Sequence, residues 1–222
     1  MSVDSASTFN NTISELANEY DTPLQKIRVM TKDEFAYKNS SFAFVSHDYS
    51  VDSAELVINP VKCGDVEKLN ARIKELSQKG YCANIADDVA GKYVATHEFA
   101  HTLLNIEQPL NNSRNWLNAD YGKIRNARKE INVVYKEYMD EVQRLTTIKK
   151  KHELEFLETA SESAWAKTHE FTKALKEVKI SNYSLESVDE FMAEAFVNEK
   201  IGISSNKYAK EVVEILNKYF KR

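Results

Sequence analysis

The stretch His97-Glu98-Phe99-Ala100-His101 governs the interpretation of the whole chain. Two histidines four residues apart on an α-helix project from the same face, so both imidazoles can reach a single ion. Neutral imidazole nitrogen is a good zinc ligand, and two such ligands at this spacing make half of a tetrahedral site. Glu98 leans to the side of that face, where it can serve as a general base without binding the metal. The alternative is an ordinary helix with two hydrogen-bonded histidines, but the apolar flanks indicate a buried helix from Tyr93 to Asn105, where an HEFAH cluster is costly without a function.

A catalytic zinc needs a third protein ligand as well as one open position. The extended pattern with three histidines requires a glycine three residues after His101 and a histidine six residues after it. Leu104 and Glu107 occupy those places, so that class is excluded. The remaining common solution is a glutamate on a later helix.

Candidates for this ligand lie in the segment Asp189–Phe196, where Glu190 and Glu194 are four residues apart beside apolar neighbours. Two carboxylates in such surroundings need a cation or hydrogen bonds to be stable. One of them can bind zinc, and the other can accept the N–H of a ligating histidine and so fix its tautomer. An exposed acidic stripe is the alternative interpretation.

The N-terminal part of the chain predicts a small sheet accompanied by helices. The first twenty residues and the segment Asp65–Lys79 have helical spacing, and Gly80 ends the second of these helices. Thr31, followed three residues later by Glu34, indicates another helix start. Three segments have strand character, and the last two of them could form an antiparallel hairpin: Leu24–Met30, Ser41–Val45 and Ala54–Asn59.

The rest of the chain predicts helices, two of which are long and amphipathic. We expect these two to meet near Lys150 and to pack as an antiparallel hairpin. The segments are Lys123–Lys149, His152–Lys179, Ser187–Lys200 and Asn206–Phe220. The predicted fold class is therefore α+β, mostly helical.

Composition narrows the possible partners. Of the 222 residues, 42% are hydrophobic and 29% are charged, with a formal net charge of -4. Acidic residues balance the basic ones throughout, so we expect no nucleic-acid partner. No apolar stretch is long enough to cross a membrane, and the first residues lack the features of a secretory signal. Cys63 and Cys82 fit no metal or redox spacing and are expected to be free thiols, with one disulfide as the alternative.

The HEFAH motif, together with the later segment Tyr183–Phe196, resembles the lethal-factor-like branch of the gluzincin metallopeptidases. It is also similar to the metallopeptidase-like domains of phage and prophage head-morphogenesis (minor capsid) proteins. In that branch the later segment reads Tyr, six residues, then Glu-Phe-Phe-Ala-Glu-Ala-Phe. This chain departs from it only at Met192, an apolar replacement for the second Phe. The two motifs cover about thirty residues of the chain.

The resemblance implies a role for each matching residue. The zinc ligands would be His97, His101 and Glu190, and the general base would be Glu98. Glu194 would support a ligating histidine. Tyr183 would donate its hydroxyl to the oxyanion, with a packing tyrosine as the alternative. We expect one zincin-like domain over residues 1–222, in which residues 122–179 form an inserted helical hairpin that the two motifs themselves do not assign.

The expected function is that of a zinc-dependent endopeptidase that acts on a peptide or protein substrate. Such a substrate would lie along a sheet edge as an added strand, against Ala54–Asn59 or Ser41–Val45. One alternative is an inactive or assembly-related structural protein of a phage, with phage structural proteins as partners. Another is a toxin-like effector protease. The expected location is cytoplasmic or virion-associated.

Overall fold

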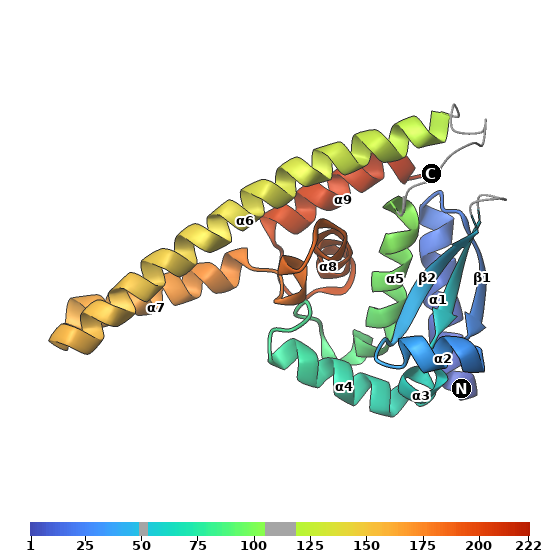
Figure 1. Ribbon diagram of the computed structural model, residues 1–222, viewed down its shortest axis with the longest axis horizontal. Helices are drawn as coiled ribbons and strands as arrows, with labels where there is room; N and C mark the ends of the chain where they lie inside the picture. Colours follow the sequence, from blue (N-terminus) through green and yellow to red (C-terminus); the bar gives the residue numbers. More distant parts are fainter. Residues whose placement is uncertain (49–52, 105–118) are drawn as a thin grey trace.

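A computed structural model describes residues 1–48, 53–104 and 119–222 of the chain (Figure 1). Within these ranges the chain is mostly helical and contains one three-stranded sheet, which confirms the predicted α+β class. In the same ranges, no helix combines the length and apolar character that a membrane span requires. Both cysteines, Cys63 and Cys82, are buried free thiols, as predicted.

The sheet has the strand order β1-β3-β2, formed by β1 (Leu24–Val29), β2 (Ala43–Asp48) and β3 (Ser53–Ile58). The predicted antiparallel hairpin is confirmed as the β2–β3 pair, and β1 runs parallel to β3 on the other side. The prediction that Ala54–Asn59 could be an edge was therefore wrong, because β3 is the central strand. Its nearly continuous burial fits that position, whereas β1 is half exposed. The other predicted edge segment, Ser41–Val45, overlaps β2, which does lie at an edge of the described sheet.

Four helices accompany the sheet in this part of the described chain. They are α1 (Val3–Glu19), α2 (Lys32–Lys38), α3 (Pro60–Cys63) and α4 (Val66–Gln78). The predicted start of α2 is confirmed, because Thr31 and Glu34 form a reciprocal capping box. After α4 the chain turns at Gly80, whose φ of 68° is readily adopted only without a Cβ.

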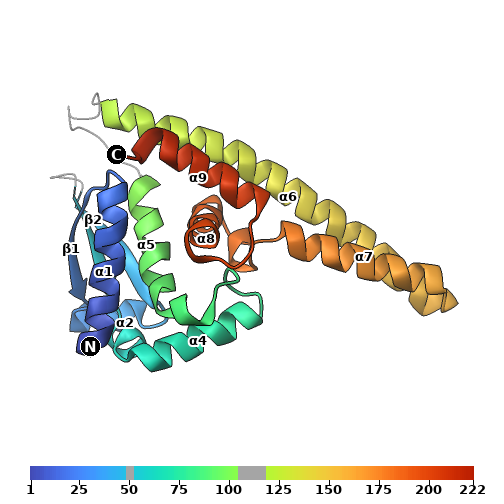
Figure 2. The same ribbon diagram turned by 180° about the vertical axis from the view of Figure 1, so that it is seen from behind.

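Helix α5 (Tyr93–Leu104) occupies the middle of the molecule and carries the HEFAH motif. It follows the 3₁₀ turn η1 (Asp87–Lys92) and is buried on nearly every side, as its apolar flanks predicted. The predicted last residue, Asn105, lies outside the described residues. One side of α5 packs on α1, β2 and β3, and the other side packs on α8 (Val188–Ile201) (Figures 1 and 2).

The long helix α6 (Ala119–Thr159) has 41 residues, which corresponds to about 60 Å. The expectation that it ends near Lys150 was wrong. Residues 150–159 contain neither Gly nor Pro, and the Lys149–Glu153 ion pair at i,i+4 spacing supports a continuous helix there. The chain turns instead at Ala160, with a φ of 49°, before α7 (Glu162–Val178). The predicted hairpin thus exists, with its turn about ten residues later.

Helix α6 packs against several other helices along its length. Its second half pairs with α7, while its first half packs against α8 and α9 (Lys207–Phe220). Ala127, Ile131 and Tyr138 of that first half are members of the main hydrophobic core. In Figures 1 and 2 the α7-covered end of the hairpin projects away from the rest of the molecule. The division into a domain and an insertion remains a prediction.

Candidate metal centre

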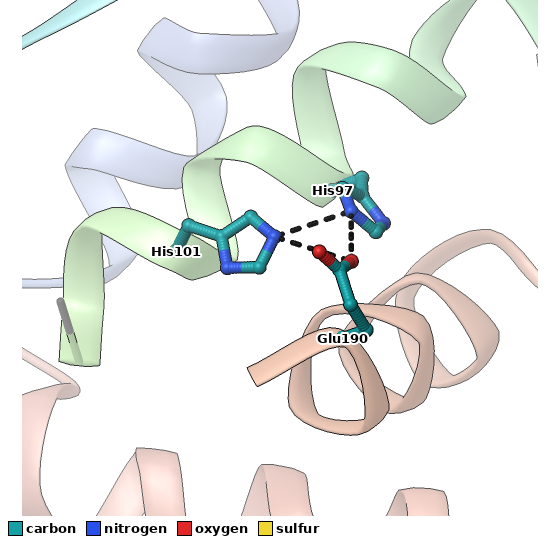
Figure 3. A group of neighbouring side chains, drawn as sticks. All are labelled: His97, His101 and Glu190. Atoms are coloured by element: carbon teal, nitrogen blue, oxygen red, sulfur yellow. Dashed lines mark hydrogen bonds and ion pairs between the residues drawn. The ribbon is translucent and has the colours of Figure 1, made fainter. Parts of the chain in front are cut away.

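Helices α5 and α8 bring three candidate ligands together where they cross (Figure 3). His97 and His101 lie one turn apart on α5, and Glu190 lies in the first turn of α8. The N-cap residue Ser187 fixes the start of α8, because its hydroxyl accepts a hydrogen bond of 3.1 Å from the backbone N–H of Glu190. The cap thereby sets the place from which the Glu190 side chain reaches α5.

The donor atoms of these three residues lie close enough together to share one metal ion. The Nε2 atom of His97 lies 3.1 Å from Oε2 of Glu190 and 3.2 Å from Nε2 of His101. The third side of the triangle, from Nε2 of His101 to Oε2 of Glu190, measures 3.6 Å. Zinc–ligand bonds of about 2.0–2.2 Å at tetrahedral angles place neighbouring ligand atoms about 3.3–3.6 Å apart. The three distances lie at or slightly below this range, so the residues present could hold a small metal ion between them.

Glu194 supports His97 from behind and is completely buried. Its Oε1 lies 3.1 Å from Nδ1 of His97 and also accepts a hydrogen bond from the hydroxyl of Tyr93. Its Oε2 accepts a hydrogen bond of 2.6 Å from the backbone N–H of Ala83. This arrangement favours the tautomer in which Nδ1 of His97 donates to the carboxylate and Nε2 is free to bind a metal.

The electrostatics of the centre favour positive charge between its carboxylates. Burial lowers the pKa of His97, but hydrogen bonds to Glu190 and Glu194 outweigh burial and raise the pKa to about 10. Burial raises the pKa of Glu190, and the neighbouring His101 and His97 outweigh it, so the pKa lies far below its usual range. A proton on His97 thus places one positive charge between the carboxylates, and a divalent metal ion would place more positive charge there.

Glu98 lies next to the three-residue group without belonging to it. Its side chain is half-buried. Burial raises the pKa of its carboxyl, against the opposing effect of the nearby histidines His101 and His97. A raised carboxyl pKa is what a general base needs near neutral pH.

Tyr183 lies in the short turn η3 (Tyr183–Leu185) and stacks on the ring of His97, with a centroid distance of 5.6 Å and an interplanar angle of 15°. Burial, together with the charge of Glu190 and a hydrogen bond to it, raises the pKa of its hydroxyl far above the usual range. The hydroxyl therefore remains protonated and able to donate. The structure places Tyr183 beside the group, and its role remains a prediction.

Two separate parts of the chain hold the Tyr183 turn. The backbone N–H groups of Asn182 and Tyr183 donate to the carbonyls of Gly80 and Tyr81, at 2.8 and 2.9 Å. Tyr81 also stacks on Tyr183 at a centroid distance of 5.4 Å. From α6, the hydroxyl of Tyr138 lies 2.7 Å from Oγ of Ser184 and is buried with it. The turn after α4 and the helix α6 thus determine the position of the tyrosine together.

Two groups that position Glu194 were not predicted from the sequence. They are the hydroxyl of Tyr93 and the backbone N–H of Ala83. Tyr93 precedes His97 by four residues and so shares its helix face, a signal that could have revealed it. No residue pattern marks the N–H of Ala83, because any residue type offers one. The isolated histidines His152 and His169 lie on the hairpin and do not belong to the group. The side chain of the remaining histidine, His47, lies outside the described residues.

Replacing Tyr93 by phenylalanine should weaken zinc binding about tenfold. The substitution removes one of the donors that hold Glu194, and loss of such an outer partner typically lowers metal affinity ten- to hundredfold. Competition with a calibrated chelator would measure the change. Tyr219→Phe removes a hydroxyl that binds Glu130, away from the centre, and is the matched control. Equal zinc affinity in Tyr93→Phe and the wild type would show that Tyr93 does not position the site.

No protein-family model, curated protein or solved structure matches this chain.

Proposed function

We propose that the protein is a zinc-dependent peptidase whose metal is held by His97, His101 and Glu190. The observation that carries the proposal is the close triangle of three donor atoms, backed by the buried Glu194. A carboxylate that supports a metal-ligating histidine is a recurrent feature of zinc sites. Glu98, adjacent in sequence to the first ligand, supplies the base that hydrolysis requires.

The metal, when bound, would supply a Lewis acid that activates water and polarises the scissile carbonyl. The protein's own groups carry the proton. Glu98 takes it from the attacking water molecule and passes it to the leaving amine. Glu194 keeps Nδ1 of His97 protonated, so the ring presents Nε2 to the metal throughout.

Tyr183 is the proposed donor to the negative oxygen that develops on the substrate carbonyl. Its ring is held by stacking on His97 and by the turn after α4, so its hydroxyl needs little reorganisation. Its raised pKa keeps the proton in place until the oxyanion forms. Tyrosine is therefore suited to this position on chemical grounds.

A zincin-like arrangement is part of the proposal, and two features support it. The helix with the two histidines packs directly against the sheet, and the strands nearest to it are β2 and β3. Of these, β2 is the edge strand, so a substrate could pair with its outer side as an added strand. A peptide paired with β2 would extend the sheet on the side where α5 packs against β2.

The test is a cleavage screen of the purified protein against a broad peptide library, read by mass spectrometry. We expect about one zinc per chain and cleavage that a chelator abolishes and added zinc restores. A protein without bound zinc in zinc-containing buffer would contradict the metal centre. Bound zinc without any cleavage would contradict the peptidase and favour a structural role.

The second candidate is an assembly protein that keeps the metal centre as a structural element. The observation in its favour is the projecting hairpin of α6 and α7, which extends well beyond what the centre needs (Figures 1 and 2). Structural zinc sites commonly have four protein ligands. The described group has three, which favours the peptidase.

A further inference from the structure

The projecting end of the hairpin carries exposed apolar side chains. Leu154 is 51% exposed, Leu157 is 78% exposed and Trp165 is 51% exposed. Within the described part of the chain, α6 and α7 have only each other here, since α8 and α9 pack near the other end of α6 (Figures 1 and 2). A two-helix layer cannot bury both of its faces, so this end has apolar surface left over.

Leu154 stands on a ridge between two hollows. One, of about 570 Å³, follows the outer face of α6 and is lined by Lys150, Leu154 and Glu158 among others. The second, of about 380 Å³, lies between α6 and α7 and includes Leu157 and Trp165. An exposed leucine that borders two hollows offers the kind of surface on which a further helix can pack.

The charges along this ridge are arranged symmetrically about Leu154. Lys150 precedes it by four residues and Glu158 follows it by four, and both are exposed. Some neighbouring charges are paired within the hairpin, as in Lys149 with Glu153, while others such as Lys151 pair with no described residue. Neither Lys150 nor Glu158 forms an ion pair with a described residue. Opposite unpaired charges thus lie at equal distances on either side of one exposed leucine.

We propose that this surface binds a second copy of the chain, with the two α6 helices antiparallel and Leu154 on the two-fold axis. Ridges formed by residues four apart pack side by side in the commonest class of helix crossing. In an isologous contact, Lys150 of each copy then faces Glu158 of the other, so the two ion pairs form together. A foreign helix would not require equal spacing of opposite charges about one leucine, whereas a two-fold axis does. This inference is independent of the proposed peptidase activity.

The surface is small, so the dimer is weak and depends on protein concentration. Sedimentation velocity from micromolar to millimolar protein should show reversible dimerisation of the wild type. Leu154→Glu should abolish it, because the substitution places two carboxylates together on the axis. A constant monomer at every wild-type concentration would overturn the proposal. Circular dichroism and thermal melting verify that each variant is folded.

Charge reversal tests the geometry itself. Lys150→Glu alone and Glu158→Lys alone should each raise the dissociation constant about tenfold or more, because each places like charges opposite one another twice. Mixing these two single variants should restore a heterodimer, since every facing pair is then again opposite in charge. The double variant Lys150→Glu/Glu158→Lys should also recover. Lys136→Glu, exposed on the same helix, is the control and should leave the dimer unchanged.

The mixing experiment separates this arrangement from other contacts. If the two single variants dimerise no better together than apart, the antiparallel two-fold contact is wrong even where the wild type dimerises. If each single variant dimerises like the wild type, Lys150 and Glu158 do not face each other, and the proposal fails in the same way.

Discussion

Glu98→Gln should abolish peptide cleavage while the protein continues to bind zinc. Glutamine keeps the shape of the side chain, but its amide cannot accept the proton of the attacking water. General-base catalysis contributes about 10²–10⁴-fold, so we expect kcat/KM to fall by about a thousandfold. His97, His101 and Glu190 are unchanged in this variant, so the metal content should equal that of the wild type.

The measurement combines kcat/KM on a cleaved library peptide with metal analysis of the same sample. Glu186→Gln is the matched control, since Glu186 is an exposed carboxylate just after the Tyr183 turn. It should retain activity within about twofold, because exposed charges contribute little. Wild-type turnover by zinc-loaded Glu98→Gln would mean that another group acts as the base.

Glu190→Gln should remove most of the zinc affinity of the protein. The neutral amide oxygen is a much poorer zinc ligand than a carboxylate, and only two imidazoles would remain. Loss of an outer partner alone costs ten- to hundredfold, so we expect loss of this direct ligand to lower affinity by more than a hundredfold. Chelator competition and metal content after dialysis would measure it.

Thermal melting gives an independent measurement of the same loss. Zinc at about a thousand times its dissociation constant stabilises the folded chain by about 4 kcal/mol, or about 10 °C for a domain of this size. Glu190→Gln should show almost none of this zinc-induced rise. The rise is compared for each variant with its own metal-free form, since the substitution also changes the partners of His97. Glu199→Gln, exposed on the same helix, should melt like the wild type. An undiminished rise in Glu190→Gln would mean that Glu190 is not a ligand.

Features set by residues close in sequence could be predicted for this chain. The capping box of Thr31 and Glu34 and the helical spacing of His97 and His101 depend on backbone geometry over one turn. The metal-ligand role of Glu190 could be predicted from the sequence for a different reason. Carboxylates in an apolar helix require compensation, and a two-histidine site lacks a ligand, so the two motifs indicated each other, and the family resemblance then selected Glu190 over Glu194.

Other features that depend on distant partners could not be predicted. Strand β1 pairs in parallel with β3 rather than β2, which no local pattern specifies. The end of α6 was misplaced because the junction was expected near Lys150, while the residues after it have good helix propensity. The N–H of Ala83 reaches Glu194 across 111 positions of sequence. Such a contact follows from the packed structure alone.

The metal centre joins residues that lie 93 positions apart, and the hairpin between them is formed by nearer neighbours. Contacts between near neighbours close quickly during folding, whereas a distant pair must wait for the chain between to become ordered. The transition state for folding should therefore contain much of the α6–α7 pair and little of the centre. Stabilisation gained after the transition state slows unfolding and leaves the folding rate nearly unchanged. A bound ion would thus slow unfolding and lengthen the lifetime of the native state, without making the protein fold faster.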